Sequence, residues 1–289
     1  MTFKQTRLLV LGANGLLGNA VTRWFSAQPE FEVVGTVRSL ATTAGLFDGL
    51  SVRLVAGIEA ESPDCLSRLF SDVDPDLVIN CIGVVKQQTS ADDPLIAIPV
   101  NSLLPHRLAR LCEISSARLI HISTDCVFSG RKGAYVEDDV PDACDLYSRS
   151  KLLGEVDRPN TVTLRTSIIG HKRGTAQGLV DWFLAQPGHV RGFAKAVFSG
   201  LPTVELARVI QEFVLPRPEL QGIYHLSVDP ISKHDLLQLV AKVYGRSNLI
   251  VSDSNLVIDR SLDSSRFRKA TGYQPPSWDA LVQRMHEFG

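Results

Sequence analysis

The sequence predicts an α/β fold: a Rossmann doubly wound parallel sheet followed by a smaller C-terminal lobe. Short, near-continuous runs of Val, Ile and Leu alternate with helical patterns through the first half of the chain, which is typical of a parallel sheet covered on both faces. A glycine-rich run follows the first apolar run. After about residue 165, glycine and proline become frequent and the alternation ends. We therefore expect a domain over residues 1–165, with some return of later segments, and a lobe over residues 166–289.

Local patterns predict the elements of the first half in chain order. Six apolar runs predict strands at residues 8–11, 32–37, 52–55, 77–81, 119–122 and 162–165. After the first strand, apolar residues at helical spacing predict a helix that begins near Leu16. Asn101 is expected to cap a later helix that carries Leu104, Leu108 and Leu111.

The lobe and the long connections are less regular. In the lobe we expect a strand over residues 223–227 and helices over residues 203–214, 232–243 and 277–287. Ser232 with Asp235 resembles a capping box at the start of the second of these helices. Residues 83–100 and 128–146 are expected as long loops, and each follows the carboxyl end of a strand, where open parallel sheets bind ligands.

Composition and charge exclude several classes of protein. The 289 residues are 44% hydrophobic and 21% charged, with a formal net charge of −1 and no basic block, so we expect no nucleic-acid or membrane partner. The N-terminus enters the first strand without a signal-peptide pattern. The five cysteines include no Cys-x-x-Cys pair and the seven histidines show no metal-ligand spacing. We therefore expect no disulfide framework, no metal site and a reduced, cytoplasmic setting.

Tyr147 and Lys151 are four residues apart, so a helix would place both side chains on one face. A lysine ammonium beside a phenol lowers the pKa of the phenol from its usual value of about 10. Such a tyrosine can donate a proton to a carbonyl oxygen that is receiving a hydride. The pair alone is weak evidence for a catalytic role, because this spacing is also common on ordinary helix surfaces.

The glycine-rich run at residues 12–18 lies between the first strand and the first helix. Gly12 permits a tight turn, Gly15 lets the backbone approach a pyrophosphate, and Gly18 lets the helix pack closely on the strand. The positive end of the helix then points at the phosphates. This succession of strand, turn and helix predicts a dinucleotide site.

The end of the second strand predicts which dinucleotide binds. An NAD site usually has an acidic residue there, which accepts from the ribose 2′-hydroxyl. This chain has Arg38 and Ser39 instead, and a guanidinium beside a hydroxyl suits a 2′-phosphate. We therefore expect NADPH, the alternative being a solvated Arg38 at a site without selectivity.

Together with the run Ser123-Thr124-Asp125 at the end of the fifth strand, these motifs resemble an extended short-chain dehydrogenase/reductase. A hydroxyl at that strand end can donate to the oxygen that Tyr147 protonates, although such hydroxyls also cap turns. The closest resemblance is to the dTDP-4-dehydrorhamnose reductase branch. It covers nearly the whole chain and includes the runs LLGE at 152–155, VFSG at 127–130, RTS at 165–167, GLPT at 200–203 and GIYHL at 222–226.

The resemblance implies a catalytic triad of Thr124, Tyr147 and Lys151. Tyr147 would give a proton to the C4 oxygen of the sugar, Lys151 would lower its pKa and bind the nicotinamide ribose, and Thr124 would orient the carbonyl. NADPH would deliver hydride to C4. The motifs and the resemblance together give the cofactor-binding residues as Gly12, Asn14, Gly15, Leu16, Gly18, Arg38, Ser39, Ile58, Cys81, Ile82, Gly83, Asn101, Tyr147, Lys151, Ser167 and Ile168.

Two departures from the branch concern the substrate. The branch usually has a tyrosine directly after the Ser-Thr-Asp run, where this chain has Cys126. The loop after the fourth strand also differs and places Lys86 and Gln87 where they would face a sugar hydroxyl, an N-acetyl group or a phosphate. We expect the substrate to contact Lys86, Gln87, Thr124, Asp125 and Cys126. The substrate can therefore be a sugar linked to dTDP, UDP or GDP.

The sequence thus predicts an NADPH-dependent reductase that acts at C4 of a nucleotide-activated 6-deoxy sugar, in a pathway to surface polysaccharide. One alternative is an epimerase or dehydratase of the same fold, although dehydratases have a second acid at the position of Cys126. Another is a non-catalytic NADP-binding regulatory subunit, because the regulatory subunit of methionine adenosyltransferase resembles the same branch. Relatives often dimerise, which leaves a homodimer open.

Overall fold

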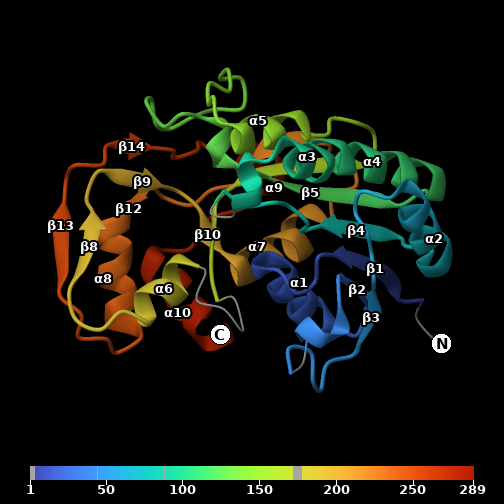
Figure 1. Cartoon of the computed structure of the whole chain (residues 1–289), viewed down its shortest axis with the longest axis horizontal. Coiled ribbons are helices and arrows are strands. Elements are labelled where there is room, and N and C mark those ends of the chain that lie inside the picture. The colour runs from blue at the N-terminus through green and yellow to red at the C-terminus, as the bar shows by residue number, and fades with distance from the viewer. Residues whose placement is uncertain (1–3, 44, 87–88, 172–177) are drawn as a thin grey trace. The chain divides into compact units, whose positions relative to one another are not determined.

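The computed structural model describes residues 4–43, 45–86, 89–171 and 178–289 (Figure 1). The chain forms two compact units: residues 1–123, 144–164 and 218–223 make the first, and residues 124–143, 165–217 and 224–289 make the second. The sequence predicts one break near residue 165, with some return of later segments to the first domain. Residues 124–143 instead pack within the second unit, where the backbone N–H of Tyr135 donates to Ser261 O. The assignment of cofactor and substrate to different parts stays a prediction.

The chain contains a seven-stranded sheet with the strand order β11-β6-β5-β4-β1-β2-β3. The strands are β1 (Thr6–Leu11), β2 (Phe31–Val37), β3 (Val52–Ala56), β4 (Leu77–Asn80), β5 (Arg118–Thr124), β6 (Thr161–Thr166) and β11 (Gly222–His225). The pairs β1–β2, β2–β3, β1–β4 and β4–β5 are parallel. The order of the first six strands is that of a doubly wound sheet, so the predicted fold class and its six strands are confirmed.

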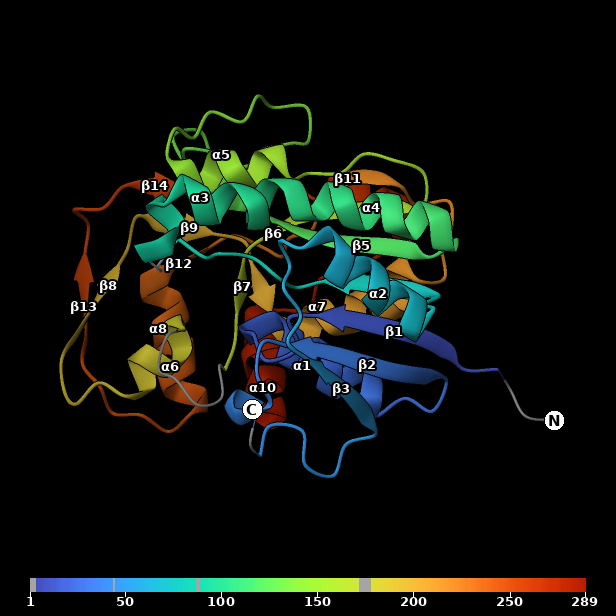
Figure 2. The same ribbon diagram turned by 45° about the vertical axis from the view of Figure 1, so that its right-hand side comes forward.

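Helices cover both faces of the sheet in the first unit. Figure 1 and Figure 2 show α1 (Leu16–Ser26) on one face and α4 (Leu104–Ser115) with α2 (Pro63–Val73) on the other. A core packs between the sheet and the second pair of helices, because the apolar stripes of both helices face it. Its members include Leu9, Leu11, Val78 and Leu119 from the strands and Leu66, Phe70, Leu104 and Leu108 from the helices.

The segment 83–100, expected as a loop, contains short helices in its described part. These are η2 (Thr89–Asp92), α3 (Pro94–Ala97) and the beginning of η3 (Ile98–Leu103), which continues into α4. Asn101 therefore lies inside a helical stretch, and its predicted role as an N-cap is wrong. Its side chain bonds to another segment instead: Asn101 Oδ1 accepts from the N–H of Val84 at 2.9 Å.

The second unit is built from shorter elements. They are β7 (Ile168–Ile169), α6 (Leu179–Leu184), β8 (Val190–Phe193), β9 (Ala196–Phe198), β10 (Leu201–Pro202), α7 (Thr203–Val209), η5 (Ile210–Val214), β12 (Ile231–Ser232), α8 (Lys233–Val243), β13 (Ile250–Asp253), β14 (Ile258–Asp259), α9 (Ser265–Thr271) and α10 (Trp278–Phe288). The three predicted helices are confirmed, and Ser232 caps α8 by accepting from the N–H of Asp235 at 3.0 Å. The predicted strand is the shorter β11.

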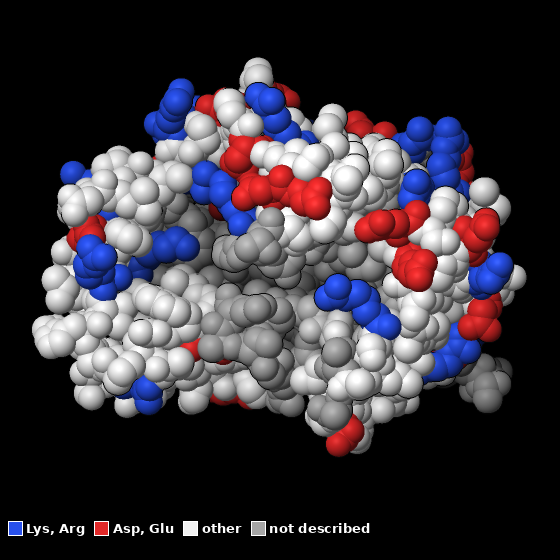
Figure 3. Space-filling view, viewed as in Figure 1, with Lys and Arg blue, Asp and Glu red and all other residues white. Residues whose placement is uncertain are grey.

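The surface and the ionisable side chains agree with the mixed composition. Figure 3 shows acidic and basic side chains interspersed over the visible face. Within the described ranges, no helix is long and apolar enough to cross a membrane. Those ranges also contain no group of three or more His, Cys, Asp or Glu side chains that could hold a metal ion. The five cysteines lie within the described ranges and form no disulfide bond there.

Candidate active site

The glycine-rich turn lies where the strand order reverses between β1 and β4. Gly12 has a φ of +79°, which favours glycine, and a methyl group added to it would lie 3.0 Å from Ile82 Cγ1 and 3.4 Å from the Cys81 carbonyl. A methyl group on Gly18 would lie 2.0 Å from the Gly12 oxygen. The turn therefore brings the predicted residues after β1 and after β4 together, and two of its glycines are sterically required.

The described residues around this turn fit a dinucleotide. Helix α1 begins after Gly15 without a side-chain cap and without an acid in its first turn, so its first amides suit an anion. The N–H of Gly12 donates to Thr36 Oγ1 at 3.0 Å, which joins the turn to the end of β2. Arg38 and Ser39 follow β2 and are exposed to solvent.

The remaining predicted positions of this region flank the turn. Asn14 lies in the turn and Leu16 is the first residue of α1. Ile58 follows β3 and packs against the core. Burial raises the pKa of the Cys81 thiol to about 12, so Cys81 stays protonated and acts as a small apolar side chain.

Tyr147 and Lys151 lie on α5 (Leu146–Leu153), as predicted. Asp145 begins the helix, because its Oδ1 accepts from the N–H of Ser148 at 3.0 Å and its Oδ2 accepts from the Ser148 hydroxyl at 2.9 Å. Tyr147 is 9% exposed and Lys151 only 6%. The helix thus buries a phenol and an ammonium together, which an ordinary helix surface would not do.

Lys151 is fixed by the backbone of β5. Its Nζ donates to the carbonyl of Ile122 at 2.8 Å. Burial lowers the pKa of Lys151 to about 8, while the negative charge of Glu155 raises it. Glu155 is itself held by the Ser123 hydroxyl, which donates to Glu155 Oε1 at 2.7 Å. Lys151 therefore remains an ammonium at neutral pH, close to the pH at which it titrates.

Asn101 joins the segment after β4 to α5. Its Nδ2 donates to Ser150 Oγ at 3.1 Å, and the Ser150 hydroxyl donates to the Tyr147 carbonyl at 2.8 Å. Gly83 lies beside both, because a methyl group on it would be 3.4 Å from Asn101 Oδ1 and 4.0 Å from Lys151 Nζ. The structure thus brings together Gly83, Asn101 and Lys151, three residues of the predicted cofactor site.

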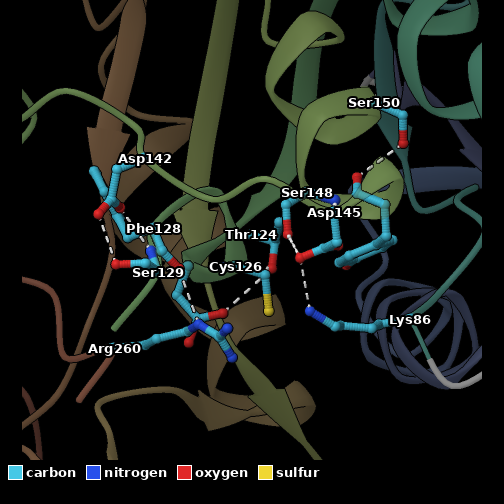
Figure 4. A network of polar contacts seen from close by, with 12 residues as sticks. Lys86, Thr124, Cys126, Phe128, Ser129, Asp142, Asp145, Ser148, Ser150 and Arg260 are labelled. Atoms are coloured by element: carbon cyan, nitrogen blue, oxygen red, sulfur yellow. Dashed lines mark hydrogen bonds and ion pairs between the residues drawn. The ribbon is translucent and has the colours of Figure 1, made fainter. Parts of the chain in front are cut away.

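Lys86 forms an ion pair with Asp145, the N-cap residue of α5. Its Nζ lies 2.9 Å from Asp145 Oδ2, as Figure 4 shows, with side chains that are 41% and 38% exposed. Burial raises the pKa of Asp145, but the hydrogen bonds from Lys86 and Ser148 outweigh it and hold the pKa below the usual value. An ion pair this exposed contributes little stability, so Lys86 can exchange Asp145 for another partner. Gln87 lies outside the described residues.

The second unit begins at the end of β5, where Thr124, Asp125 and Cys126 turn into η4 (Asp125–Val127). Thr124 Oγ1 accepts from the N–H of Cys126 at 3.1 Å and donates to Asp125 Oδ1 at 3.2 Å. Burial raises the pKa of Asp125, and the positive charge of Arg260 opposes this effect. Figure 4 shows Arg260 beside this turn, with its Nε donating to the Phe128 carbonyl at 2.9 Å.

The loop after β5 is ordered by aromatic and polar contacts within the second unit. The rings of Phe128 and Tyr135 stack with centroids 4.2 Å apart, and the Tyr135 hydroxyl accepts from the N–H of Gly130 at 3.1 Å. His225 Nδ1 lies 2.9 Å from the Tyr135 carbonyl. Burial, aided by the charge of Arg165, lowers the pKa of His225 to about 4, so it stays neutral. Through Tyr135, these contacts connect the VFSG run at 127–130 with the GIYHL run at 222–226.

Ser167 and Ile168 also belong to the second unit. The Ser167 carbonyl accepts from the N–H of Leu201 at 2.9 Å, and a methyl group on Gly200 would lie 2.4 Å from the same oxygen. The RTS and GLPT runs therefore pair because β7 and β10 approach closely at a glycine.

Three polar residues beside these motifs were not predicted from the sequence. Asp145 had a local signal, since an acid two residues before Tyr147 can cap the helix that carries it. Lys233 and Arg260 had none. Their charges act on Asp125 although they lie more than a hundred residues further along the chain, and no local pattern predicts such a contact.

Comparisons with known proteins cover the whole of this architecture. The family model described as the RmlD substrate binding domain matches residues 6–287. A curated relative from Haloferax volcanii, named "probable low-salt glycan biosynthesis reductase Agl14", is 35% identical over 273 residues, which cover 90% of this chain and 87% of the relative. Methionine adenosyltransferase 2 subunit beta from Danio rerio is 29% identical over 82% of this chain and 74% of its own length.

A solved structure shares the fold at full length. The dTDP-4-dehydrorhamnose reductase of Bacillus anthracis, crystallised in complex with NADP, matches with a TM-score of 0.80 and 18% identity, covering 98% of this chain and 99% of its own. At this identity the match establishes the fold alone.

Proposed function

The chain belongs to the RmlD substrate binding domain family, and we propose that it is an NADPH-dependent reductase of the C4 keto group of a nucleotide-activated 6-deoxy sugar. The name of the Haloferax relative, a glycan biosynthesis reductase, supports a product destined for surface polysaccharide. The observation that carries the proposal is α5, on which Tyr147 is buried with Lys151, an ammonium anchored on the β5 carbonyl of Ile122.

Three side chains would donate the proton and orient the carbonyl. Tyr147 donates its phenolic proton to the C4 oxygen, and Lys151 stabilises the phenolate that remains. Thr124 donates its hydroxyl to the same oxygen. Because that hydroxyl has one proton, Thr124 must first release Asp125 Oδ1, to which it donates in the structure. NADPH, when bound, supplies the hydride that converts the carbonyl to an alcohol.

The cofactor would be held mainly by the first unit. The turn glycines Gly12, Gly15 and Gly18 admit the diphosphate to the amides at the start of α1. Arg38 and Ser39 would take the 2′-phosphate, which supports NADPH over NADH. Lys151 would donate to the nicotinamide ribose. Of the other predicted positions, Ser167 and Ile168 would approach the nicotinamide, and Asn101 would hold Gly83 and α5 in place.

The test follows NADPH consumption with 4-keto-6-deoxy sugars carried on dTDP, UDP and GDP, with and without N-acetyl groups. We expect one sugar nucleotide to be reduced, and Tyr147→Phe to reduce turnover by ~10²–10⁴-fold while NADPH still binds. Tyr224→Phe is the matched control and should retain activity. Full activity of Tyr147→Phe would contradict the mechanism.

Other outcomes of the same assay separate the alternatives. Conversion of a sugar nucleotide without net NADPH consumption would indicate an epimerase or dehydratase. NADPH binding with no turnover across the panel would favour a regulatory subunit, an alternative that the similarity to methionine adenosyltransferase 2 subunit beta supports.

We also propose a homodimer, on the resemblance to relatives that dimerise. Light scattering of the full chain, with and without NADPH, measures the assembly directly. A mass of one chain, 31.6 kDa, at every concentration would exclude it.

A further inference from the structure

Two cationic side chains of the second unit face the turn that follows Thr124. Lys233 is the first residue of α8, and Arg260 directly follows β14. Both charges act on Asp125, whose side chain is buried. Cys126, the residue that replaces a tyrosine of the reductase branch, is among the groups that affect the pKa of Lys233. Neither cation belongs to the motifs that predicted the active site.

Among the residues that the structure describes, Arg260 uses only its Nε in a side-chain hydrogen bond. Its Nε donates to the Phe128 carbonyl at 2.9 Å, and its backbone N–H donates to the Val197 carbonyl at 3.1 Å. A guanidinium carries five N–H donors in a fixed planar fork. The anchored side chain therefore presents a preorganised edge, suited to the paired oxygens of a phosphate or carboxylate.

Lys233 is anchored by an aromatic ring. Its Nζ lies 5.3 Å from the centroid of the Phe198 ring, a cation–π contact that uses none of its three N–H donors. Burial lowers the pKa of Lys233, and the negative charge of Asp125 opposes this effect. An ammonium at the start of α8 also lies at the positive end of the helix dipole. An anion beside Lys233 would relieve both penalties.

Two positive charges act on the same buried carboxylate. Arg260 and Lys233 both lower the pKa of Asp125, which accepts the Thr124 hydroxyl at 3.2 Å. Among the residues that the structure describes, neither cation forms a close ion pair, in contrast to Arg208 and Arg284 on buried Glu205. Partly desolvated cations without a close counter-charge are costly unless a ligand supplies one.

We propose that Lys233 and Arg260 form an anion-binding subsite next to Thr124, which takes an oxyanion of the substrate. Two sources have this chemistry: the diphosphate of the nucleotide, and a carboxylate on the sugar. The identification of the ligand as a sugar nucleotide rests on the proposed function.

Calorimetry on the full chain with NADPH tests the subsite without turnover. The probes are dTDP, UDP, UDP-glucose and UDP-glucuronate, titrated into wild type, Lys233→Gln and Lys233→Arg. Lys242→Gln is the matched control, since Lys242 lies on the same helix and pairs with Asp279. We expect Lys233→Gln to weaken binding about tenfold or more, Lys233→Arg to bind nearly as wild type, and Lys242→Gln to change nothing.

The pattern of losses identifies the anion. A similar loss for all four probes assigns the subsite to the diphosphate. A loss confined to UDP-glucuronate, with UDP-glucose unchanged, assigns it to a sugar carboxylate. Unchanged affinities for all probes in both Lys233→Gln and Arg260→Gln, with melting temperatures near wild type, would overturn the subsite. Absence of reductase activity would leave these affinities as they are, so the two proposals fail separately.

Discussion

Lys151 of the first unit and Lys233 of the second are both lysines that burial makes less basic, yet they are held in different ways. Lys151 donates to a carbonyl of the sheet, Ile122 O, and lies beside Gly83. Lys233 rests on the face of the Phe198 ring. The first uses one donor on the backbone and cannot move without breaking that hydrogen bond. The second donates to no partner among the described residues, so its donors are available to a ligand.

The difference teaches how one residue type can serve two purposes. A lysine that adjusts the pKa of a neighbour must be fixed relative to it, which a backbone carbonyl does well. A lysine that binds a ligand needs unused donors, which an aromatic ring preserves. We therefore expect changes at Lys151 to lower kcat, and changes at Lys233 to raise KM and weaken binding.

We expect Lys151→Met to cause the largest loss of kcat. Loss of the ammonium removes the charge that favours the Tyr147 phenolate, so we expect kcat to fall ~10²–10⁴-fold. The fold should keep its stability, because the variant removes a desolvated charge. Steady-state kinetics and thermal melting measure both quantities. Arg149→Met, an exposed residue of the same helix, serves as the control. A KM effect with unchanged kcat would remove the distinction between the two lysines.

Thr124→Val tests whether the start of the second unit joins in the chemistry. The variant loses the only hydroxyl donor at that position, and we expect kcat to fall about 10²-fold. Thr124→Ser should restore most of the rate, because it keeps the hydroxyl that donates to Asp125 in the structure. If kcat of Thr124→Val is no lower than kcat of Thr124→Ser, the Thr124 hydroxyl takes no part in the reaction and serves only to cap η4.

The pH dependence should follow Lys151 and not Lys233. The pKa of Lys151 is lowered to about 8 by burial, so the side chain is an ammonium below that pH and a neutral amine above it. Initial reductase rates should therefore be level below about pH 8 and fall toward tenfold per pH unit above it. Lys233→Gln should leave this inflection in place. A profile that is flat to pH 10 would contradict the role of Lys151.

Arg38 supplies an exposed cation with which to compare the two buried ones. We expect Arg38→Ala to reduce the preference for NADPH over NADH about tenfold, because the charged hydrogen bond to the 2′-phosphate is lost. Arg53→Ala, which removes an exposed arginine on β3, should not change the preference. The ratio of kcat/KM for the two cofactors measures it. Equal turnover of both by wild type would show that Arg38 does not select.

Most elements of the first unit could be predicted from the sequence, because the patterns that indicate them involve residues close together in the chain. Each of the six predicted strands is a short segment rich in Val, Ile or Leu, and the turn at Gly12 needs glycine for its own backbone angle. The pair Tyr147 and Lys151 needed only the helical repeat to be placed on one helix. Where a local signal misled, as at Asn101, the side chain had a distant partner, the backbone of Val84.

The second unit was predicted only in part because its elements are short and its contacts are distant. Strands such as β7 and β10 have two residues each, too few for any periodicity, and they pair because Gly200 lets them approach. His225 Nδ1 lies 2.9 Å from the Tyr135 carbonyl, a contact between residues that are ninety positions apart in the chain.

The sequence by itself determined the sheet, the dinucleotide turn and the helix that carries Tyr147 and Lys151, since periodicity and glycine geometry act between neighbours in the chain. Only the tertiary structure decided the electrostatics: the burial that lowers the pKa of Lys151 to about 8, and the approach of Lys233 and Arg260 to Asp125. Desolvation and Coulomb energies depend on distances in space, and those distances exist only once the chain has folded.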